Sequence, residues 1–278
     1  MTCTAFVLGG GGVLGACEVG MAQALLERGI VPDLVVGTSI GALNGVAIAA
    51  DPTEPGIARL VDLWARLSSD DVLGGTALGR IGRLARYGTH MHGNEPLRRM
   101  LEQTLPVRSF EELPVRFECV AASVERAEEH WFSSGSLIPA VLASAALPGV
   151  LPPVEIDGEH FLDGGLVNSI PISRAIQLGA DVVYVLHVGR IEEPLAAPQR
   201  LWEVAFVAFE IARRHRFNAD LRAIPEDITV HVLPTGAGQR RPTTWSNLRY
   251  RDIRRIGDRV ERAYEATGDY LDGSARTL

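Results

Sequence analysis

The chain has 278 residues, of which 46% are hydrophobic and 22% are charged, and this balance excludes an intrinsically disordered or collagen-like protein. Its formal net charge of −7 disfavours nucleic acid, so we expect no nucleic-acid partner. Three cysteines spread over this length exclude a disulfide framework and are typical of a reducing, cytoplasmic compartment.

The first fifty residues alternate between apolar runs and helical patterns. Thr4–Leu8 predicts a buried strand that a run of glycines closes, and it lacks the basic segment of a signal peptide. A helix that stops at Gly29 follows, and then Leu34–Val36 predicts a second strand and Ile40–Ala50 a second helix. Strands and helices in alternation predict parallel strands with helices on the sheet faces, which is an α/β fold.

The rest of the chain also contains both predicted strands and predicted helices, as expected for an α/β fold. Strands are predicted over Phe117–Val124, His130–Phe132, Val182–Val188 and Ile228–Leu233, with a hairpin of Val154–Ile156 and His160–Leu162 about an Asp157-Gly158 turn. Helices are predicted over Ile57–Leu67, after Asn94, after Ser136, over Ile172–Leu178 and Leu201–Leu221, and from Trp245 towards Tyr270.

No internal repeat or linker divides the chain, so we predict one domain over residues 1–278. Its core covers about residues 4–190, and a largely helical part follows at 195–278. Residues 68–93 mix glycine, arginine and histidine without a period, and we interpret them as an irregular flap. The longest apolar stretch, Leu201–Ala212, is too short to span a bilayer.

A glycine-rich loop follows the first strand. Gly10–Gly15 spells Gly-Gly-Gly-Val-Leu-Gly, which fits the G-x-G-x-x-G pattern of dinucleotide-binding proteins. Such a protein needs an acidic residue at the end of the second strand, whereas Asp33 precedes that strand. A nucleotide-binding module that uses Gly10–Gly15 therefore stays an alternative, but an incomplete one.

A second motif occupies the end of the second strand. Gly37-Thr38-Ser39-Ile40-Gly41 fits G-x-S-x-G, a strained turn that exposes a serine hydroxyl between a strand and a helix. Side chains at Gly37 or Gly41 would crowd this corner. We predict that Ser39 is a nucleophile and that the backbone amides of the preceding loop, at Gly10, Gly11 and Gly12, form an oxyanion hole. The dipole of the helix that begins at Ile40 favours the same developing negative charge.

The serine needs a base, and a third motif, Asp163-Gly164-Gly165, follows the predicted hairpin. With it, the sequence resembles the patatin-like phospholipase family, bacterial lipid acyl hydrolases with a Ser-Asp dyad. Four segments over about residues 4–190 carry the resemblance: Gly9–Gly15, Gly37–Gly41, Ala143–Pro148 with Pro152-Pro153-Val154, and Asp163-Gly164-Gly165 continuing to Gly179-Ala180-Asp181. In one respect the chain departs from the family, because Leu14 stands where the loop usually carries arginine or lysine.

The resemblance implies a three-layer α/β/α fold with a mainly parallel central sheet. It also implies that Ser39 is the nucleophile, that Asp163 is its general base and that carboxylic esters of lipids are hydrolysed without a metal or other cofactor. An aspartate with an ordinary pKa of ~3.9 is a weak base for a serine. We therefore predict that burial raises the pKa of Asp163.

Histidines suggest two alternative sites. His187 follows Asp163 in the chain order of a Ser-Asp-His triad, so an α/β-hydrolase-type esterase that uses His187 is an alternative. His90 and His92 have an H-x-H spacing, but no third ligand lies at a metal-site spacing. We therefore expect no metal.

Arginine is concentrated in residues 80–99 and 239–262. These stretches could hold the protein on anionic lipid head groups, or they could be solvated helix faces. Trp202, Phe206 and Phe209 recur at helical spacing and could line an acyl channel or belong to the core. We expect a cytoplasmic enzyme that acts on a lipid or other acyl ester and could contact the inner membrane face peripherally; the oligomeric state is not predicted.

Overall fold

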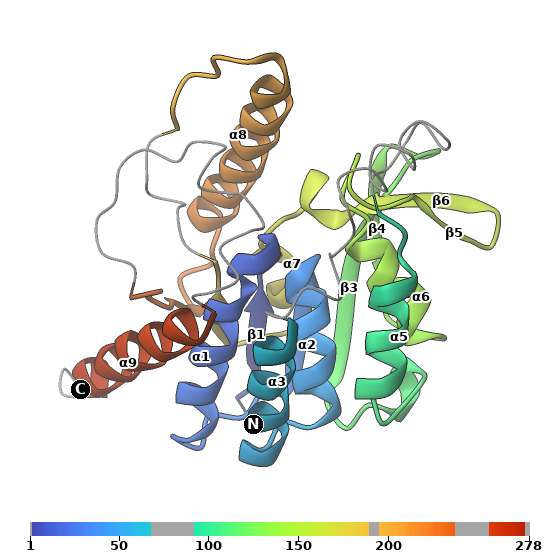
Figure 1. Cartoon of the computed structure of the whole chain (residues 1–278). Helices are drawn as coiled ribbons and strands as arrows, with labels where there is room; N and C mark the ends of the chain where they lie inside the picture. Colours follow the sequence, from blue (N-terminus) through green and yellow to red (C-terminus); the bar gives the residue numbers. More distant parts are fainter. Residues whose placement is uncertain (1, 68–91, 189–194, 237–255, 276–278) are drawn as a thin grey trace.

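A mixed eight-stranded sheet forms the centre of the computed structural model, which describes residues 2–67, 92–188, 195–236 and 256–275 (Figure 1). Its strands are β1 (Thr4–Leu8), β2 (Leu34–Thr38), β3 (Arg116–Ser123), β4 (Glu128–Phe132), β5 (Val154–Ile156), β6 (Glu159–Asp163), β7 (Val182–Leu186) and β8 (Thr229–Val232). The order across the sheet is β5-β6-β3-β2-β1-β7-β8, and β4 also pairs with β3.

The strands at the centre of the sheet are parallel. β3, β2, β1, β7 and β8 pair in parallel, whereas β4, β5 and β6 form antiparallel pairs. Parallel strands need crossover connections, which the helices between them supply. The carboxyl ends of β1, β2 and β7 therefore meet at one edge of the sheet, which is where such sheets place their ligand sites.

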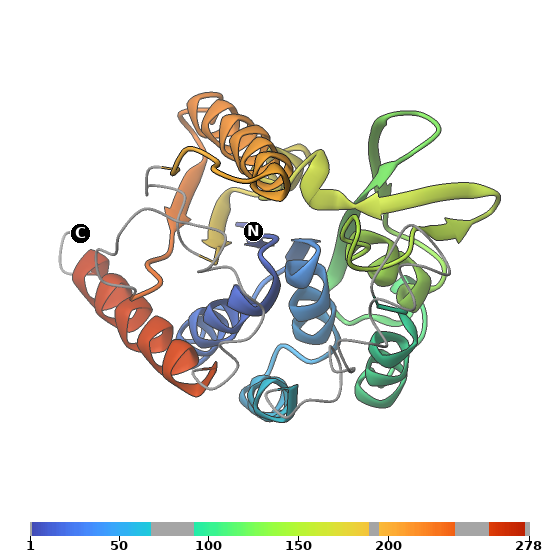
Figure 2. The same ribbon diagram turned by 45° about the horizontal axis from the view of Figure 1, so that its top comes forward.

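Helices cover both faces of the sheet. They are α1 (Ala16–Leu26), α2 (Ile40–Ala50), α3 (Glu54–Leu67), α5 (Glu95–Thr104), α6 (Leu137–Ser144), α7 (Ile172–Gln177), α8 (Leu201–Arg222) and α9 (Ile256–Ala275), with short 3-10 turns η1 (Gly12–Gly15), η2 (Phe110–Glu112) and η3 (Gly164–Leu166). Figure 2 shows α8 across the sheet from α1, α2, α3 and α9.

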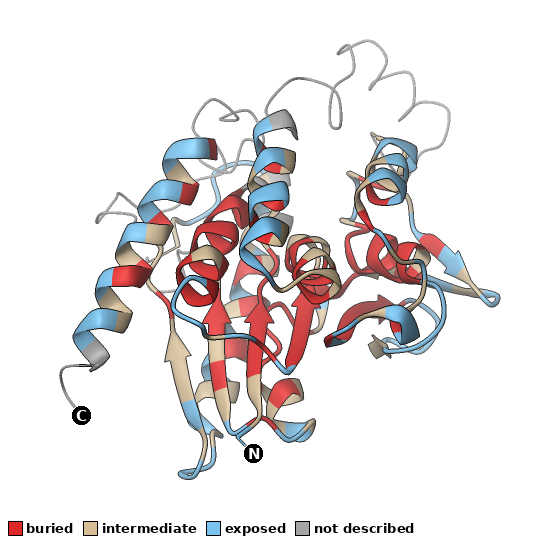
Figure 3. Ribbon diagram, turned by 90° about the horizontal axis from the view of Figure 1, so that it is seen from below, coloured by how far each residue is buried: buried red, intermediate tan, exposed pale blue. Residues whose placement is uncertain are grey.

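The side chains of β1 show why two helical layers form. Phe6 and Leu8 belong to the cluster shared with α1, α2, α3 and α9, whereas Ala5 and Val7 belong to the cluster shared with α7 and α8. Alternate residues of a strand point to opposite faces, so a strand buried on both faces needs an apolar residue at every position. Figure 3 shows buried residues concentrated in the central strands. The predicted three-layer α/β class is confirmed.

Most predicted elements lie where the sequence patterns placed them. α2 has the predicted bounds, and β5 and β6 form the predicted hairpin, with φ of 52° at Asp157 and 81° at Gly158. The predicted flap falls almost wholly on residues 68–91, outside the described residues, as does the 245–255 part of the last predicted helix. Within the described ranges, no helix has both the length and the apolarity that crossing a bilayer requires. That residues 1–278 form one domain stays a prediction.

Candidate active site

Ser39 occupies a sharp turn between β2 and α2. Its backbone has φ of 56° and ψ of −120°, a conformation that non-glycine residues rarely adopt and that is concentrated at functional sites. A methyl group at Gly41 would lie 2.4 Å from the carbonyl oxygen of Leu8, and one at Gly37 would lie 2.5 Å from the carbonyl oxygen of Gly41. The predicted steric need for both glycines is confirmed.

The register of three neighbouring strands brings Asp163 to Ser39. Thr38 of β2 pairs with Val120 of β3, and the next residue of β3, Ala121, pairs with Asp163 of β6. The residue after Thr38 and the end of β6 therefore reach the same level of the sheet. Across 124 residues of sequence, the Ser39 hydroxyl donates a hydrogen bond of 2.5 Å to Oδ2 of Asp163.

Asp163 is buried and held by backbone groups. Its residue is 1% exposed, Oδ1 accepts a hydrogen bond of 2.7 Å from the Gly165 amide, and its own amide donates to the Ala146 carbonyl at 3.0 Å. Burial raises the pKa of this carboxyl to about 6, although the hydrogen bonds from Ser39 and Gly165 act in the opposite direction. The predicted rise in the pKa of Asp163 is confirmed.

The C-terminal end of α6 supports both residues of the pair. The Ser39 amide donates to Oγ of Ser144 at 3.0 Å, while the Ala146 carbonyl holds Asp163. Ser144 is fully buried. Sequence reasoning did not single out Ser144, although the run Ala143–Pro148 that contains it is one of the four segments of the family resemblance.

The glycine loop lies beside Ser39, but it differs from the predicted arrangement at one residue. A methyl group at Gly10 would lie 3.4 Å from Cβ of Ser39, so this backbone is adjacent to the serine. The Gly10 amide, however, donates to the Ser169 carbonyl at 2.9 Å, which leaves it no hydrogen for an oxyanion and corrects its predicted role as a donor. Within the described ranges, the partly exposed Gly11 and Gly12 have no acceptor for their amides.

His187 directly follows β7. Burial and the nearby charge of Arg213 lower the pKa of its imidazole to about 4, and the ring makes a backbone hydrogen bond with Leu233. The Ser39 hydroxyl is bonded to Asp163 directly, without an intervening ring. This geometry favours the two-residue arrangement over the alternative triad through His187.

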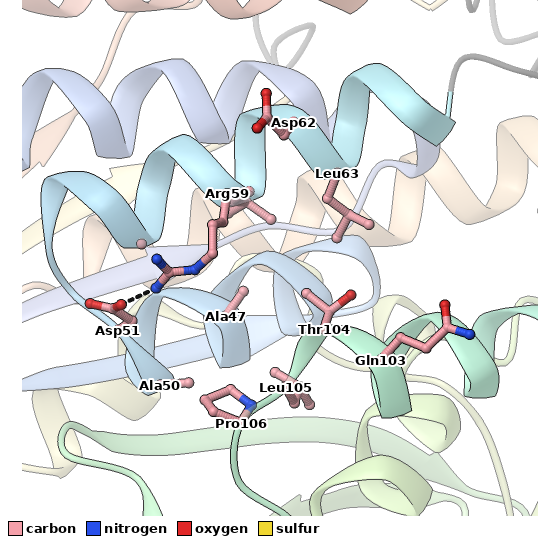
Figure 4. A pocket seen from close by; sticks show the side chains of 12 residues that line it. Ala47, Ala50, Asp51, Arg59, Asp62, Leu63, Gln103, Thr104, Leu105 and Pro106 are labelled. Atoms are coloured by element: carbon pink, nitrogen blue, oxygen red, sulfur yellow. Dashed lines mark hydrogen bonds and ion pairs between the residues drawn. The ribbon is translucent and has the colours of Figure 1, made fainter.

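Two further features lie apart from the Ser39–Asp163 pair. A cavity of about 400 Å³ opens between α2, α3 and the end of α5, and the Arg59–Asp51 ion pair lies in its wall (Figure 4). Its lining includes neither Ser39 nor Asp163. Among the residues that the structure describes, no cluster of three or more histidine, cysteine or acidic side chains could hold a metal. His90 is outside these residues, so the H-x-H pair with His92 is not placed.

The family assignment follows from comparison with known proteins. A family model described as patatin-like phospholipase matches residues 6–176. The chain belongs to the patatin-like phospholipase family. Lysophospholipase nte1 of Aspergillus terreus is 32% identical over 195 residues, and its counterpart in Emericella nidulans is 33% identical over the same length. Each match covers 67% of this chain but 12% of the relative, so the chain spans only a small part of these longer proteins.

A solved structure supports the patatin-like fold. Human GIVD cytosolic phospholipase A2, in complex with methyl gamma-linolenyl fluorophosphonate and terbium chloride, matches with a TM-score of 0.50. The match covers 99% of this chain and 59% of the human chain at 13% sequence identity, so it shows a likeness of fold alone.

Proposed function

We propose that this protein is a serine hydrolase that cleaves carboxylic ester bonds of lipids through a dyad of Ser39 and Asp163. The hydrogen bond of 2.5 Å between the strained serine and the buried aspartate carries the proposal, because it pairs a nucleophile with a base where the carboxyl ends of the central strands lie. Membership of the patatin-like phospholipase family supports it, as do relatives named lysophospholipase.

The first step is attack of Ser39 Oγ on the acyl carbonyl. As the new C–O bond forms, the serine proton passes to Oδ2 of Asp163, which already accepts its hydrogen bond. Negative charge develops on the carbonyl oxygen, where the amides of Gly11 and Gly12 and the N-terminus of α2 stabilise it. One oxyanion donor is commonly worth ~3 kcal/mol of the barrier.

The second step releases the alcohol and then the acid. Protonated Asp163 donates its proton to the leaving alkoxide as the ester C–O bond breaks, and an acyl-enzyme on Ser39 results. A water molecule then attacks this ester, again losing a proton to Asp163, and the serine is regenerated when that proton returns to Oγ. The pKa of about 6 suits both roles, because Asp163 is ionised at neutral pH yet retains affinity for a proton.

Cytoplasmic location and contact with an anionic membrane belong to the same proposal. Arg98, Arg99, Arg259 and Arg262 are described, but most of the arginine-rich stretches at 80–99 and 239–262 lies outside the described residues. The peripheral contact therefore stays a prediction from the sequence.

The pH dependence of ester hydrolysis tests the dyad. Because the base form of Asp163 is required, kcat/KM for a monoacylglycerol is expected to rise about tenfold per pH unit below pH 6 and to level off above it. Initial rates measured from pH 4.5 to 8.5, with Ser39→Ala as the blank, give this profile. A rate that is flat from pH 5 to 8, or a Ser39→Ala variant as active as the wild type, would refute the proposal.

A further inference from the structure

Arg213 is a buried arginine whose hydrogen-bonding capacity is only partly used. It lies on α8, is 8% exposed, and donates from Nη1 to Glu210 at 3.0 Å. Its Nε and Nη2 atoms have no hydrogen-bond partner among the described residues. A guanidinium cannot lose its charge inside a protein, and an unpaired buried N–H group costs free energy. The two nitrogens therefore favour an acceptor that is not part of the described chain.

The geometry of the guanidinium restricts what this acceptor can be. Nε and Nη2 lie on the same edge of the planar group, so their N–H bonds run side by side. Such a pair binds two oxygens attached to one atom, as in a carboxylate or a phosphate. The tetrahedral intermediate of ester hydrolysis carries one oxyanion, so it does not offer this pair of oxygens. The amides of the glycine loop, which lie beside Ser39, suit that oxyanion instead.

The position of Arg213 on α8 relates it to the dyad. A methyl group at Gly165 would lie 3.0 Å from the ring of Phe209, so α8 packs over the turn whose amide holds Asp163. Arg213 follows Phe209 by four residues, and residues so spaced share one face of a helix. Arg213 therefore lies one helical turn from the contact between α8 and the segment that contains Asp163.

The charge of Arg213 acts on three groups around the site. It partly opposes the rise that burial causes in the pKa of Asp163, at the end of β6, and of Glu18, in the first turn of α1. It adds to the fall that burial causes in the pKa of His187, after β7. Of these elements, α1 directly follows the glycine loop, and the last residue of β7, Leu186, accepts a hydrogen bond of 3.0 Å from the Gly9 amide. Residues 9–15 of that loop contain no basic side chain. Arg213 thus supplies positive charge to a site whose glycine loop has none.

We propose that Arg213 binds the phosphodiester of a phospholipid or lysophospholipid and so selects this substrate class over uncharged glycerides. The inference rests on the proposed hydrolase function and names its substrate. The short glycerol unit joins the scissile ester to the phosphate, so a cation that recognises the phosphate must lie near the nucleophile. A monoacylglycerol leaves Nε and Nη2 without an acceptor.

Two substrates with the same acyl chain test the proposal. With lysophosphatidylcholine, Arg213→Gln is expected to lower kcat/KM by about 10- to 100-fold, mostly through KM, because a bidentate charged contact is lost. With the matching monoacylglycerol the same variant is expected to change kcat/KM less than about threefold when both substrates are assayed at pH 8.5, because this pH lies well above the pKa of about 6 of Asp163 and the lost charge then has little effect on its ionisation. Arg213→Lys keeps the positive charge but not the two N–H groups that run side by side. A loss of about tenfold is therefore expected on the phosphodiester substrate alone.

Arg216 provides the matched control. It lies on the same helix, is more exposed, and is paired with Glu129 at 2.9 Å and with Asp220 at 3.1 Å. Arg216→Gln removes the same charge and is expected to leave the ratio of the two substrates unchanged. An equal loss on both substrates in Arg213→Gln, or no loss on either, would overturn the phosphodiester assignment. Hydrolysis of both substrates that survives Ser39→Ala would instead refute the dyad.

A competition experiment uses the wild-type protein, so its result does not depend on whether a variant folds. Glycerophosphocholine, which carries the phosphodiester but no acyl ester, is expected to inhibit monoacylglycerol hydrolysis by the wild-type protein competitively. Inorganic phosphate is tested in the same assay, and it is expected to inhibit more weakly than glycerophosphocholine. Inhibition by inorganic phosphate alone would assign the site to free phosphate and contradict the lipid, and inhibition by neither compound would contradict an anion site altogether.

Discussion

Replacing Asp163 with asparagine is expected to lower kcat for ester hydrolysis by about 10³- to 10⁴-fold, because a carboxamide cannot take the serine proton. The substitution preserves size, and its carbonyl oxygen can still accept the Gly165 amide that Oδ1 accepts at 2.7 Å. Single-turnover hydrolysis of a monoacylglycerol measures the loss. A folded Asp163→Asn variant with near wild-type turnover would show that another group is the base.

The same variant is expected to be more stable than the wild type at neutral pH. In the folded protein the pKa of Asp163 is raised from its ordinary 3.8 to about 6, so the protonated carboxyl stabilises the fold. This contribution is complete below pH 3.8 and is lost as pH rises through 6. At one pKa unit per 1.36 kcal/mol, the buried charge costs about 3 kcal/mol at pH 8.

Thermal unfolding of both proteins between pH 4 and pH 8 measures this effect. Asparagine does not titrate, so the Tm of Asp163→Asn minus that of the wild type is expected to be small at pH 4 and to grow towards pH 8. A difference that is independent of pH, or that shrinks as pH rises, would contradict the raised pKa.

Replacing Gly41 with alanine is expected to destabilise the fold by about 3 kcal/mol and to remove activity. The added methyl group would lie 2.4 Å from the Leu8 carbonyl oxygen and 2.8 Å from that of Gly9. Because both are backbone atoms, no side-chain rotation relieves the overlap. Either α2 moves away from β1, carrying Ser39 with it, or the fold is strained.

Gly257→Ala is the matched control for Gly41→Ala. Gly257 lies in the first turn of α9, and a methyl group there would meet no atom within 4 Å. Alanine is favoured over glycine in a helix by roughly 0.5–1 kcal/mol, so this variant is expected to be slightly more stable. Urea denaturation of both variants measures their free energies of unfolding. A Gly41→Ala protein as stable as the wild type would show that the turn between β2 and α2 is not tightly packed.

Much of the fold could be predicted because local signals agree with packing. The helix Ile40–Ala50 begins after a turn that needs Gly37 and Gly41 for steric reasons, and the Asp157-Gly158 turn adopts the positive φ values that its residues tolerate. The pairing of Ser39 with Asp163 is different, since 124 residues separate them. Only the family resemblance indicated it, and the register of β2, β3 and β6 is its physical cause.

The remaining features depend on contacts that no local pattern reveals. The Gly10 amide is bound by Ser169, which the chain reaches only after the antiparallel hairpin. Arg213 lies within a run of basic residues from Arg213 to Arg216, and their sequence does not indicate which one turns inward. In the structure Arg213 is 8% exposed while Arg216 is more exposed, because one helical face packs towards the sheet.

Covalent labelling by a fluorophosphonate ester, followed by peptide mapping, tests the dyad most directly. The Ser39–Asp163 mechanism predicts a single adduct on Ser39, a labelling rate in His187→Ala within about threefold of the wild type, and a rate at least about 100-fold lower in Asp163→Asn. An adduct on another residue, or labelling that a folded His187→Ala variant loses and Asp163→Asn retains, would contradict the Ser39–Asp163 mechanism.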